Sequence, residues 1–369
     1  MLYLLHRLHE ADSWRLVFNL FRYVTFRAAA AAATAFIGTV ILLPVLIRLL
    51  RRSQILENTA HPHSEELTRL HKQKNGTPTM GGLGILAGVL GASLLWADLA
   101  NRYVLLAMAM VIALGALGVA DDWMKLRGIG LPGMPGRWKL AGQVVVATAV
   151  GLILAAGGDG GFSATRLAVP FLKPDIFTPE LGPWYAAIAV FLIVGSSNAV
   201  NLTDGLDGLA SGCSTVAALA YSVLAYIAGH SAIAGYLNVP FIRGAEEMTI
   251  LCAAMGGALL AFLWYNAHPA EIFMGDTGAL AIGGLLGVAA CVAKQELLLA
   301  LVGGVFVLET GSVILQVASF KLRRRRIFRI APLHLHLRSI GWSEDKVVVR
   351  FWIVSIICAL MSVATLKVR

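Results

Sequence analysis

Acidic and carboxamide side chains gather in residues 196–210, inside one of the longest apolar runs of the sequence. Asp204 and Asp207 stand three positions apart there, and Asn198 and Asn201 come shortly before them. If this stretch is helical, the two carboxylates share one face of the helix. Polar groups in an apolar segment are costly unless they have partners or a function. We therefore expect this stretch to belong to a functional site.

Further polar clusters interrupt the apolar blocks at residues 71–82, 121–125, 264–278 and 332–336, and two more polar residues open another block near residue 140. The side chains in these clusters that could take part in catalysis or binding are Lys74, Thr79, Asp121, Asp122, Lys125, Lys139, Gln143, Asn266, Phe273, Asp276, His334 and His336. The adjacent aspartates at 121 and 122 repel each other at the edge of an apolar block and need a cation nearby.

Carboxylates with lysines, and without a thiol- or histidine-rich ligand set, favour a hard cation held by oxygen atoms, either Mg²⁺ or Mn²⁺. Mg²⁺ usually keeps several waters and takes phosphate oxygens as further ligands. At a membrane surface, this combination indicates group transfer between a soluble phosphorylated donor and a lipid phosphate. Such a reaction depends on charge neutralisation and positioning more than on a strong acid.

Several of these residues also have a purely structural interpretation. Asp276 precedes an apolar run and could cap a helix. His334 and His336 could be ordinary interfacial histidines, and the arginines at 323–326 could set topology or contact anionic lipid. Glu309 lies in the middle of an expected span, where we predict a buried pairing.

The elements that position these groups must be membrane helices. The chain has 369 residues, of which 58% are hydrophobic and 14% charged, and this composition excludes an ordinary soluble domain. The apolar blocks run for about 20 residues, as spanning helices require, and lack the alternation of membrane strands. The net charge of +9 then reflects membrane topology and not nucleic-acid binding.

We predict an all-α polytopic membrane protein with ten transmembrane helices. The spans are expected near residues 28–47, 79–99, 103–120, 140–157, 184–201, 209–229, 247–266, 278–293, 297–319 and 348–366. Lys and Arg concentrate in the connections after the first, third and ninth spans, which predicts that odd-to-even connections are cytoplasmic and both termini periplasmic. The polar clusters, and hence the active site, then lie at the cytoplasmic face.

The rest of the chain gives no sign of a second domain or an internal repeat. Residues 1–27 fit a weakly amphipathic segment lying on the membrane interface, and residues 157–183 form a periplasmic loop. We expect a single membrane domain over residues 1–369.

The polar clusters taken together resemble those of a known family. The motifs are residues 74–82 (KNGTPTMGG), 121–125 (DDWMK), 198–208 (NAVNLTDGLDG), 266–268, 273–278 (FMGDTG), 309–317 and 329–336. They are similar, in the same order and over nearly the whole chain, to the phospho-N-acetylmuramoyl-pentapeptide transferases of the polyprenyl-phosphate N-acetylhexosamine-1-phosphate transferase superfamily.

This resemblance implies transfer of phospho-MurNAc-pentapeptide from UDP-MurNAc-pentapeptide to undecaprenyl phosphate, which yields lipid I and UMP in the first membrane step of peptidoglycan synthesis. It implies Mg²⁺ as cofactor, ten transmembrane helices, a homodimer and a place in the bacterial inner (cytoplasmic) membrane.

The resemblance also implies roles for individual residues. Asp276 would be the Mg²⁺ ligand, and Asp121 and Asp122 the catalytic pair, with Asp121 as candidate base for the lipid phosphate. A nucleoside pocket would comprise Asn198, Asp204, Gly205, Leu206, Asp207 and Phe273. The phosphates or the floor of the site would be lined by Lys74, Thr79, Lys125, Lys139, Asn266 and Gln316. His334 and His336 would face the diphosphate or the sugar, with His334 the catalytic candidate.

One motif departs from the family pattern. Members usually show three consecutive histidines followed by an aromatic and an acidic residue, whereas here Leu335 separates His334 from His336, and Leu337 and Arg338 follow. A role that rests on the middle imidazole is therefore absent from this chain.

Alternatives remain open for both mechanism and function. Direct attack by the lipid phosphate on the donor β-phosphate is favoured over a two-step route through an aspartyl phosphate. A sister transferase with a UDP-N-acetylglucosamine-type donor is the nearest rival. A secondary transporter is the rival from another class, but its ionisable residues would lie near the midplane and repeat between halves.

Overall fold

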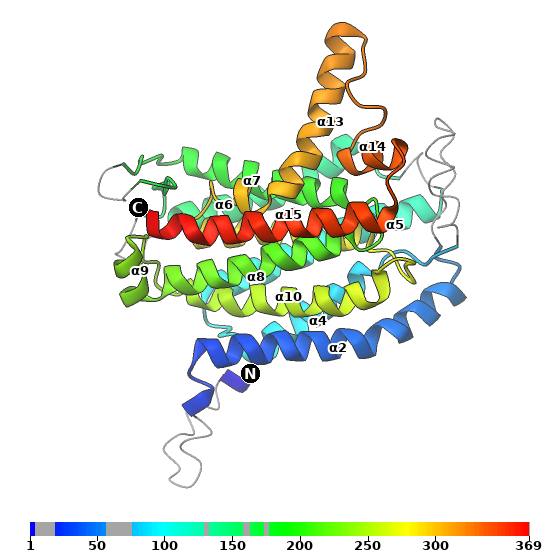
Figure 1. The fold of residues 1–369 in the computed structure, drawn as a ribbon. Helices are drawn as coiled ribbons and strands as arrows, with labels where there is room; N and C mark the ends of the chain where they lie inside the picture. Colours follow the sequence, from blue (N-terminus) through cyan, green and yellow to red (C-terminus); the bar gives the residue numbers. More distant parts are fainter. Residues whose placement is uncertain (4–18, 57–75, 129–132, 158–162, 173–176, 369) are drawn as a thin grey trace.

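The computed structural model describes residues 1–3, 19–56, 76–128, 133–157, 163–172 and 177–368. In these residues the regular secondary structure is helical apart from two isolated β-bridges (Figure 1). The helices are α2 (Val24–Arg52), α4 (Gly82–Trp96), α5 (Arg102–Leu126), α6 (Gly136–Ala156), α7 (Trp184–Thr203), α8 (Leu209–Gly229), α9 (Ser231–Leu237), α10 (Glu246–Asn266), α11 (Gly275–Val292), α12 (Leu299–Val302), α13 (Gly304–Arg323), α14 (Leu333–Ser339), α15 (Glu344–Thr365) and the 3₁₀ turn η3 (Leu366–Val368).

In the described part of the chain, nine helices are long and apolar enough to cross a membrane. They are α2, α5, α6, α7, α8, α10, α11, α13 and α15. The second expected span corresponds to α4, an apolar helix of 15 residues. The prediction of an all-helical, multi-pass membrane protein is therefore confirmed.

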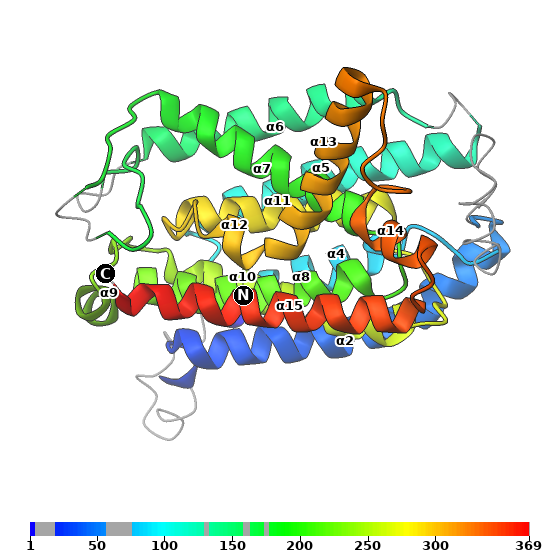
Figure 2. The same cartoon turned by 45° about the horizontal axis from the view of Figure 1, so that its top comes forward.

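Helix α11 lies at the centre of the bundle, where α4, α5, α7 and α8 surround it (Figure 2). Every residue from Asp276 to Val292 is buried. Small residues allow this close packing, since a side chain at Gly283 would collide with the backbone oxygen of Ser196. The Ser196 hydroxyl donates in turn to the carbonyl oxygen of Gly283 at 2.6 Å. The apolar core is thus built around the helix that carries Asp276.

Helix α13 leaves the bundle at a steep angle, unlike its long neighbours (Figure 1). The span expected at 297–319 is interrupted at Gly303, where the short helix α12 ends and α13 begins. As a result Glu309 lies near the buried start of α13, and not in mid-span as the sequence predicted. The predicted buried pairing of Glu309 is confirmed, because its carboxylate contacts Nδ1 of His334 at 3.0 Å.

The connection between α7 and α8 is a tight turn and not a helix. Helix α7 ends at Thr203, and α8 begins after Gly208, which has a φ of +78° that favours glycine. The sharing of a helix face by Asp204 and Asp207, which applied only to a helical stretch, therefore does not occur. The glycines give residues 204–208 a bend that a continuous helix could not make.

Candidate active site

The described polar clusters lie at one end of the bundle. Helices α5, α7 and α10 end there, while α6, α8, α11 and α15 begin there, and α14 packs beside them (Figure 1). Side chains from widely separated parts of the chain therefore meet in space.

A carboxylate–lysine cluster forms between α5, α6, α7 and α11; we use this name for Asp121, Lys125, Lys139, Asn201 and Asp276. Both lysine Nζ atoms lie close to Oδ2 of Asp276, at 2.5 Å for Lys125 and 2.6 Å for Lys139. The same two Nζ atoms lie 3.1 Å from Oδ2 of Asp121. Two ammonium groups thus compensate two carboxylates whose side chains are almost fully buried.

Asp122 has a different task from its neighbour Asp121. Its carboxylate accepts hydrogen bonds from the backbone N–H groups of Asp276 (3.1 Å) and Thr277 (3.0 Å), and from the Thr277 hydroxyl (2.7 Å). These are the first N–H groups of α11, which have no partner within the helix, and a negative charge there is favourable. Asp122 of α5 therefore caps α11 from another helix.

Asp276 does not cap its own helix. The first turn of α11 has no side-chain cap from its own N-cap residue, and the Asp276 carboxylate points instead into the cluster. Its Oδ1 accepts a hydrogen bond from Nδ2 of Asn201 at 2.6 Å. Gly275 has a φ of +73°, and a side chain there would collide with Oδ2 of Asp122. This glycine lets the start of α11 approach α5 closely.

The donor set of this cluster fits a hard divalent cation. Oδ2 of Asp276 and Oδ2 of Asp121 lie close enough to contact the same Nζ of Lys139. Carboxylate oxygens are the ligand type that Mg²⁺ takes in proteins. The cationic partners of these oxygens are lysines, which can also contact phosphate. The residues present are therefore compatible with the ion that the family resemblance implies.

A second polar pair lies one helical turn before Asn201. Asn198 donates to Oε1 of Gln143 at 2.8 Å and to the carbonyl of Val194 at 2.8 Å. The Gln143 amide is buried and also donates to the Ser197 hydroxyl. In the structure Asn198 thus joins α7 to α6, away from the Asp207 side of the turn.

His334 of α14 and Glu309 of α13 form a buried pair. Glu309 accepts from the backbone N–H of His334 at 3.2 Å, and it contacts Nδ1 of the ring at 3.0 Å. A proton on Nδ1 leaves the lone pair on Nε2, which has no hydrogen-bond partner among the described residues. This atom points at Gly205, where a Cβ would lie 2.3 Å from it. His334 is thereby fixed against the 204–208 turn.

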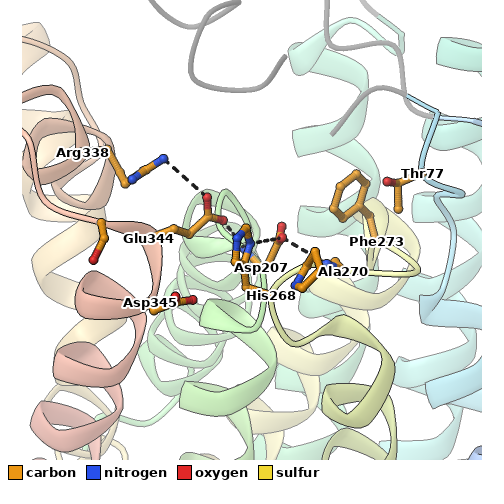
Figure 3. Close-up of a pocket in the computed structure, with 10 residues that line it drawn as sticks. Thr77, Asp207, His268, Ala270, Phe273, Arg338, Glu344 and Asp345 are labelled. Atoms are coloured by element: carbon orange, nitrogen blue, oxygen red, sulfur yellow. Dashed lines mark hydrogen bonds and ion pairs between the residues drawn. The ribbon is translucent and has the colours of Figure 1, made fainter. Parts of the chain in front are cut away.

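A pocket of about 300 Å³ opens on the other side of this turn (Figure 3). We call it the Asp207 pocket. Its lining residues are Thr77, Asp207, His268, Pro269, Ala270, Phe273, Arg338, Ser343, Glu344 and Asp345. An aromatic ring and several carboxylates suit a flat ligand that donates hydrogen bonds from N–H or O–H groups.

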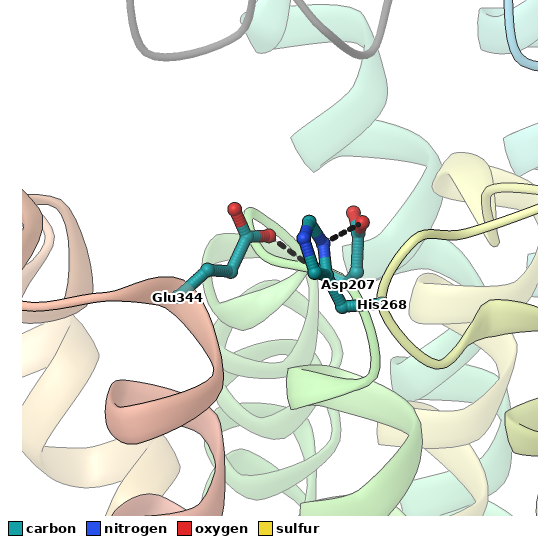
Figure 4. Close-up of side chains that lie close together, drawn as sticks. All are labelled: Asp207, His268 and Glu344. Carbon is teal, nitrogen blue, oxygen red and sulfur yellow. Dashed lines mark hydrogen bonds and ion pairs between the residues drawn. The ribbon is translucent and has the colours of Figure 1, made fainter.

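Three polar side chains meet at the floor of the Asp207 pocket (Figure 4). Nδ1 of His268 lies 2.9 Å from Oδ2 of Asp207, and Oε1 of Glu344 accepts the backbone N–H of Asp207 at 3.0 Å. Each of the three offers one potential ligand atom, within 4.8 Å of the others. The hydrogen bonds among them already account for this closeness.

Asn266, Phe273 and Thr79 belong to the framework of this pocket. The Asn266 amide donates to the carbonyl of Ile272 at 2.9 Å, and its oxygen accepts from the N–H of Gly208 at 3.1 Å. Phe273 forms a backbone hydrogen bond to Pro78, next to the buried Thr79. Asn266 therefore holds the 204–208 turn and leaves ligand contact to neighbouring side chains.

Two predicted residues lie apart from both groups. Gln316 of α13 uses its amide to bind the backbone of Ile327 and Phe328, at 2.9–3.0 Å. His336 accepts the N–H of Arg329 and packs on Phe328. Both side chains shape the segment between α13 and α14. Lys74 lies outside the described residues, so its predicted role cannot be placed.

The segment 201–207 connects all of these groups. Asn201 contacts Asp276, Gly205 faces His334, and Asp207 lines the pocket. Six residue steps span at most about 20 Å. Asp204 ends α7 within this segment and is half-buried, and Leu206 is buried in the core. The cluster, the histidine and the pocket thus lie within reach of one extended ligand.

The sequence did not single out Glu344, Arg338 or His268 as site residues. Glu344 and Asp345 look like the acidic first turn of a helix, which is a common helix-start pattern. Only the folded chain brings this turn to Asp207. Asn201 was noted for its polarity but was not assigned a role, and the structure joins it to Asp276.

Comparison with known proteins places this site in a family. The model of glycosyl transferase family 4 matches residues 103–294. A phospho-N-acetylmuramoyl-pentapeptide-transferase from Maridesulfovibrio salexigens is 51% identical over 353 residues, which cover 95% of this chain and 96% of that protein. A protein of the same name from Koribacter versatilis is 47% identical, and the match covers 95% of each chain. Another from Desulfosudis oleivorans is 48% identical, and the match covers 100% of each chain. The chain therefore belongs to glycosyl transferase family 4 and, within it, to the phospho-N-acetylmuramoyl-pentapeptide-transferases.

Proposed function

We propose that this protein transfers phospho-MurNAc-pentapeptide from UDP-MurNAc-pentapeptide to undecaprenyl phosphate, releasing UMP and forming lipid I in peptidoglycan synthesis. The observation that carries this proposal is the match over nearly the full length to relatives with that name. The carboxylate–lysine cluster, at the bundle end where the described polar groups meet, supports it because its charges suit a diphosphate donor.

The residues divide into a phosphate end and a nucleoside end. Lys125 and Lys139 would neutralise the diphosphate, and Asp121 would hold or accept a proton of the lipid phosphate. Phe273 and Asp207 would bind the uridine. Nε2 of His334, which has no hydrogen-bond partner in the described part of the chain, would face the substrate between the two ends.

We propose Asp276 as the ligand of Mg²⁺. When bound, this ion supplies positive charge that stabilises the leaving phosphate oxygens. Asn201 would orient the Asp276 carboxylate through its hydrogen bond to Oδ1. Asp122 would fix the position of Asp276 by capping α11.

Direct transfer is the favoured route. An oxygen of the lipid phosphate attacks the β-phosphate of the donor, and the bond from that phosphorus to the oxygen of UMP breaks. The two lysines hold the charge that develops on the transferred group. In the two-step alternative a carboxylate attacks first. Incubation with the donor alone, followed by mass spectrometry, tests this, because a phosphorylated aspartate would overturn the direct route.

The decisive assay uses the purified full chain with UDP-MurNAc-pentapeptide, undecaprenyl phosphate and Mg²⁺, and it measures UMP. Rapid UMP release that requires all three additions is expected. Competition with UDP-N-acetylglucosamine tests the sister activity, and preferential use of that donor would contradict the proposal. Uptake of donor into proteoliposomes without UMP would instead favour a transporter.

We further propose one membrane domain with ten spans and with both termini periplasmic. The short helix α4 would be the second span and would bring the nine long apolar helices of the described residues to ten. This topology fits the bacterial inner membrane and the concentration of Lys and Arg in connections at the site's end. A homodimer remains part of the proposal from family resemblance. Crosslinking of the protein in native membranes tests it.

A further inference from the structure

Helix α14 and the start of α15 form an elbow, residues 333–344, which contacts the 204–208 turn at two points. His334 faces Gly205 at one point. At the other, Oε1 of Glu344 accepts the backbone N–H of Asp207 at 3.0 Å. The elbow therefore contacts Gly205 and Asp207 of the turn at once, and Figure 3 shows the part of the elbow that carries Glu344.

We propose that Glu344 is a positioning residue for donor binding, which fixes Asp207 of the pocket relative to His334 of the same elbow. This inference rests on the proposed function, because it assigns Asp207 to the nucleoside end of the donor. Glu344 itself acts through the backbone of the turn.

The surroundings of Glu344 hold its carboxylate in place. It is only 6% exposed and lies in the first turn of α15, where the helix dipole favours a negative group. Nη2 of Arg338 lies 3.8 Å from its Oε2, and Nη1 of Arg338 donates to the carbonyl of Trp342 at 2.9 Å. A hydrogen bond accepted by a buried carboxylate is stronger than one between neutral groups.

Other contacts hold the turn without Glu344. Oδ2 of Asp207 accepts the N–H of Ala270 at 3.2 Å and contacts His268. Asn266 accepts the N–H of Gly208, and Trp352 donates to the Gly208 carbonyl at 3.0 Å. Loss of the Glu344 carboxylate should therefore leave the turn folded. What should change is the position of Asp207 relative to the elbow that carries His334.

The test is steady-state kinetics of Glu344→Gln in the full chain, in one detergent. The KM for UDP-MurNAc-pentapeptide should rise about tenfold, and the inhibition constant of UMP should rise by a similar factor. The kcat and the KM for undecaprenyl phosphate should change less than about twofold. Glu344→Asp keeps the charge but shortens the side chain, and it should show the same pattern.

Glu271→Gln is the control. Glu271 is exposed, lies in the connection before α11 and is not among the residues that line the Asp207 pocket, so its loss removes an equal charge without touching the turn. Its KM for the donor should stay within about twofold of the wild-type value. An equal rise in this control would show a general charge effect and overturn the proposal.

Failure of the inference differs from failure of the proposed function. If the wild-type protein releases no UMP, the proposed function fails. If it releases UMP while both Glu344 variants keep the wild-type donor KM, the positioning role is wrong. A fall in kcat alone, or failure of both variants to fold, would make Glu344 a stability residue and would also overturn it.

Discussion

At the scale of single residues, charge compensation decides how the site is arranged. Asp276 and Asp121 are almost fully buried, and each shares the ammonium groups of Lys125 and Lys139. Burying a carboxylate without such partners would be strongly unfavourable. The lysines of this site therefore compensate the buried carboxylates and are also the groups proposed to meet phosphate.

The Asp276→Asn variant removes one charge and keeps the side-chain size. Its Mg²⁺-dependent UMP release should fall by at least about a hundredfold, because a main electrostatic group of the transition state is lost. Binding of Mn²⁺, measured by electron paramagnetic resonance, should weaken as well. Glu271→Gln, an exposed acid in the preceding connection, is the control. Normal rates and Mn²⁺ binding in Asp276→Asn would refute the ligand assignment.

Gly205 gives a steric test of His334. A methyl group at this position would lie 2.3 Å from Nε2, so Gly205→Ala must displace the imidazole or the turn. UMP release should fall at least about tenfold, as expected when a catalytic group is misplaced. Gly195→Ala lies on α7, the helix before this turn, where a Cβ meets no atom of the described residues within 4 Å, and it should keep normal activity. Equal activity of the two variants would show that the His334 contact is unimportant.

At the scale of helices, the site depends on how α11 starts. Its first N–H groups are satisfied by Asp122 of α5, which ties the position of Asp276 to the helix that carries Asp121 and Lys125. The adjacent aspartates thus differ in their contacts. Asp121 contacts both lysines, whereas Asp122 lies 3.6 Å from Lys125 and caps a neighbouring helix.

Asp122→Ala should therefore affect stability as well as activity. The buried N–H groups of Asp276 and Thr277 would lose their acceptor, at a cost of about 1–3 kcal/mol. The thermal unfolding midpoint should fall, and the kcat should fall with it. Thr277→Val removes only the hydroxyl donor and should lower the midpoint less. A larger loss in Thr277→Val than in Asp122→Ala would contradict the capping role.

The opposite end of the bundle holds another buried ion pair, formed by Lys294 and Glu296. Lys294 donates to the carbonyls of Ala164 (2.5 Å) and Arg166 (3.3 Å), and its Nζ lies 3.6 Å from Oε1 of the buried Glu296. Burial lowers the pKa of the Lys294 amine and raises that of the Glu296 carboxyl. Each group therefore depends on the other to stay charged.

Lys294→Met should release the segment that contains residues 163–172. Hydrogen exchange of the Leu167 and Leu181 amides, which bond to Pro179 and Thr165, should accelerate. Arg166→Gln breaks only an exposed ion pair with Glu180 and should have little effect. Unchanged exchange in Lys294→Met would show that the Lys294 contacts do not hold this segment.

At the scale of the whole molecule, the proposed topology can be tested with cysteine labels. Glu180 and Arg325 are exposed and lie in connections that are assigned to opposite sides of the membrane. In intact cells, a membrane-impermeant maleimide that reaches the periplasm should label Glu180→Cys. It should label Arg325→Cys only after the inner membrane is opened. Of the four native cysteines, Cys213, Cys252 and Cys291 are buried and should react little, and the half-buried Cys358 is replaced by serine in both variants. The reverse labelling pattern would overturn the proposed orientation.

Much of the fold could be predicted because its signals are local. Apolar blocks of helical length identify the spans, and most expected spans overlap an observed helix. Errors arose where tertiary contacts determine the backbone. Hydropathy continues across Gly303 and hides the break before α13. Whether residues 204–208 are helical was left open by the sequence, and the structure shows a turn in which Gly208 has a positive φ.

Residue types and their order already define which chemistry is available to this protein, because Asp121, Lys125, Asp276 and His334 identify the family and its charged groups. Which of these groups meet depends on the packing of the helices. This packing separated Asp122 from Asp121, paired His334 with Glu309, and brought Glu344 to Asp207 across 137 residues. Residue type is written locally in the chain, whereas a contact between distant residues depends on how helices pack, and no local pattern encodes that packing.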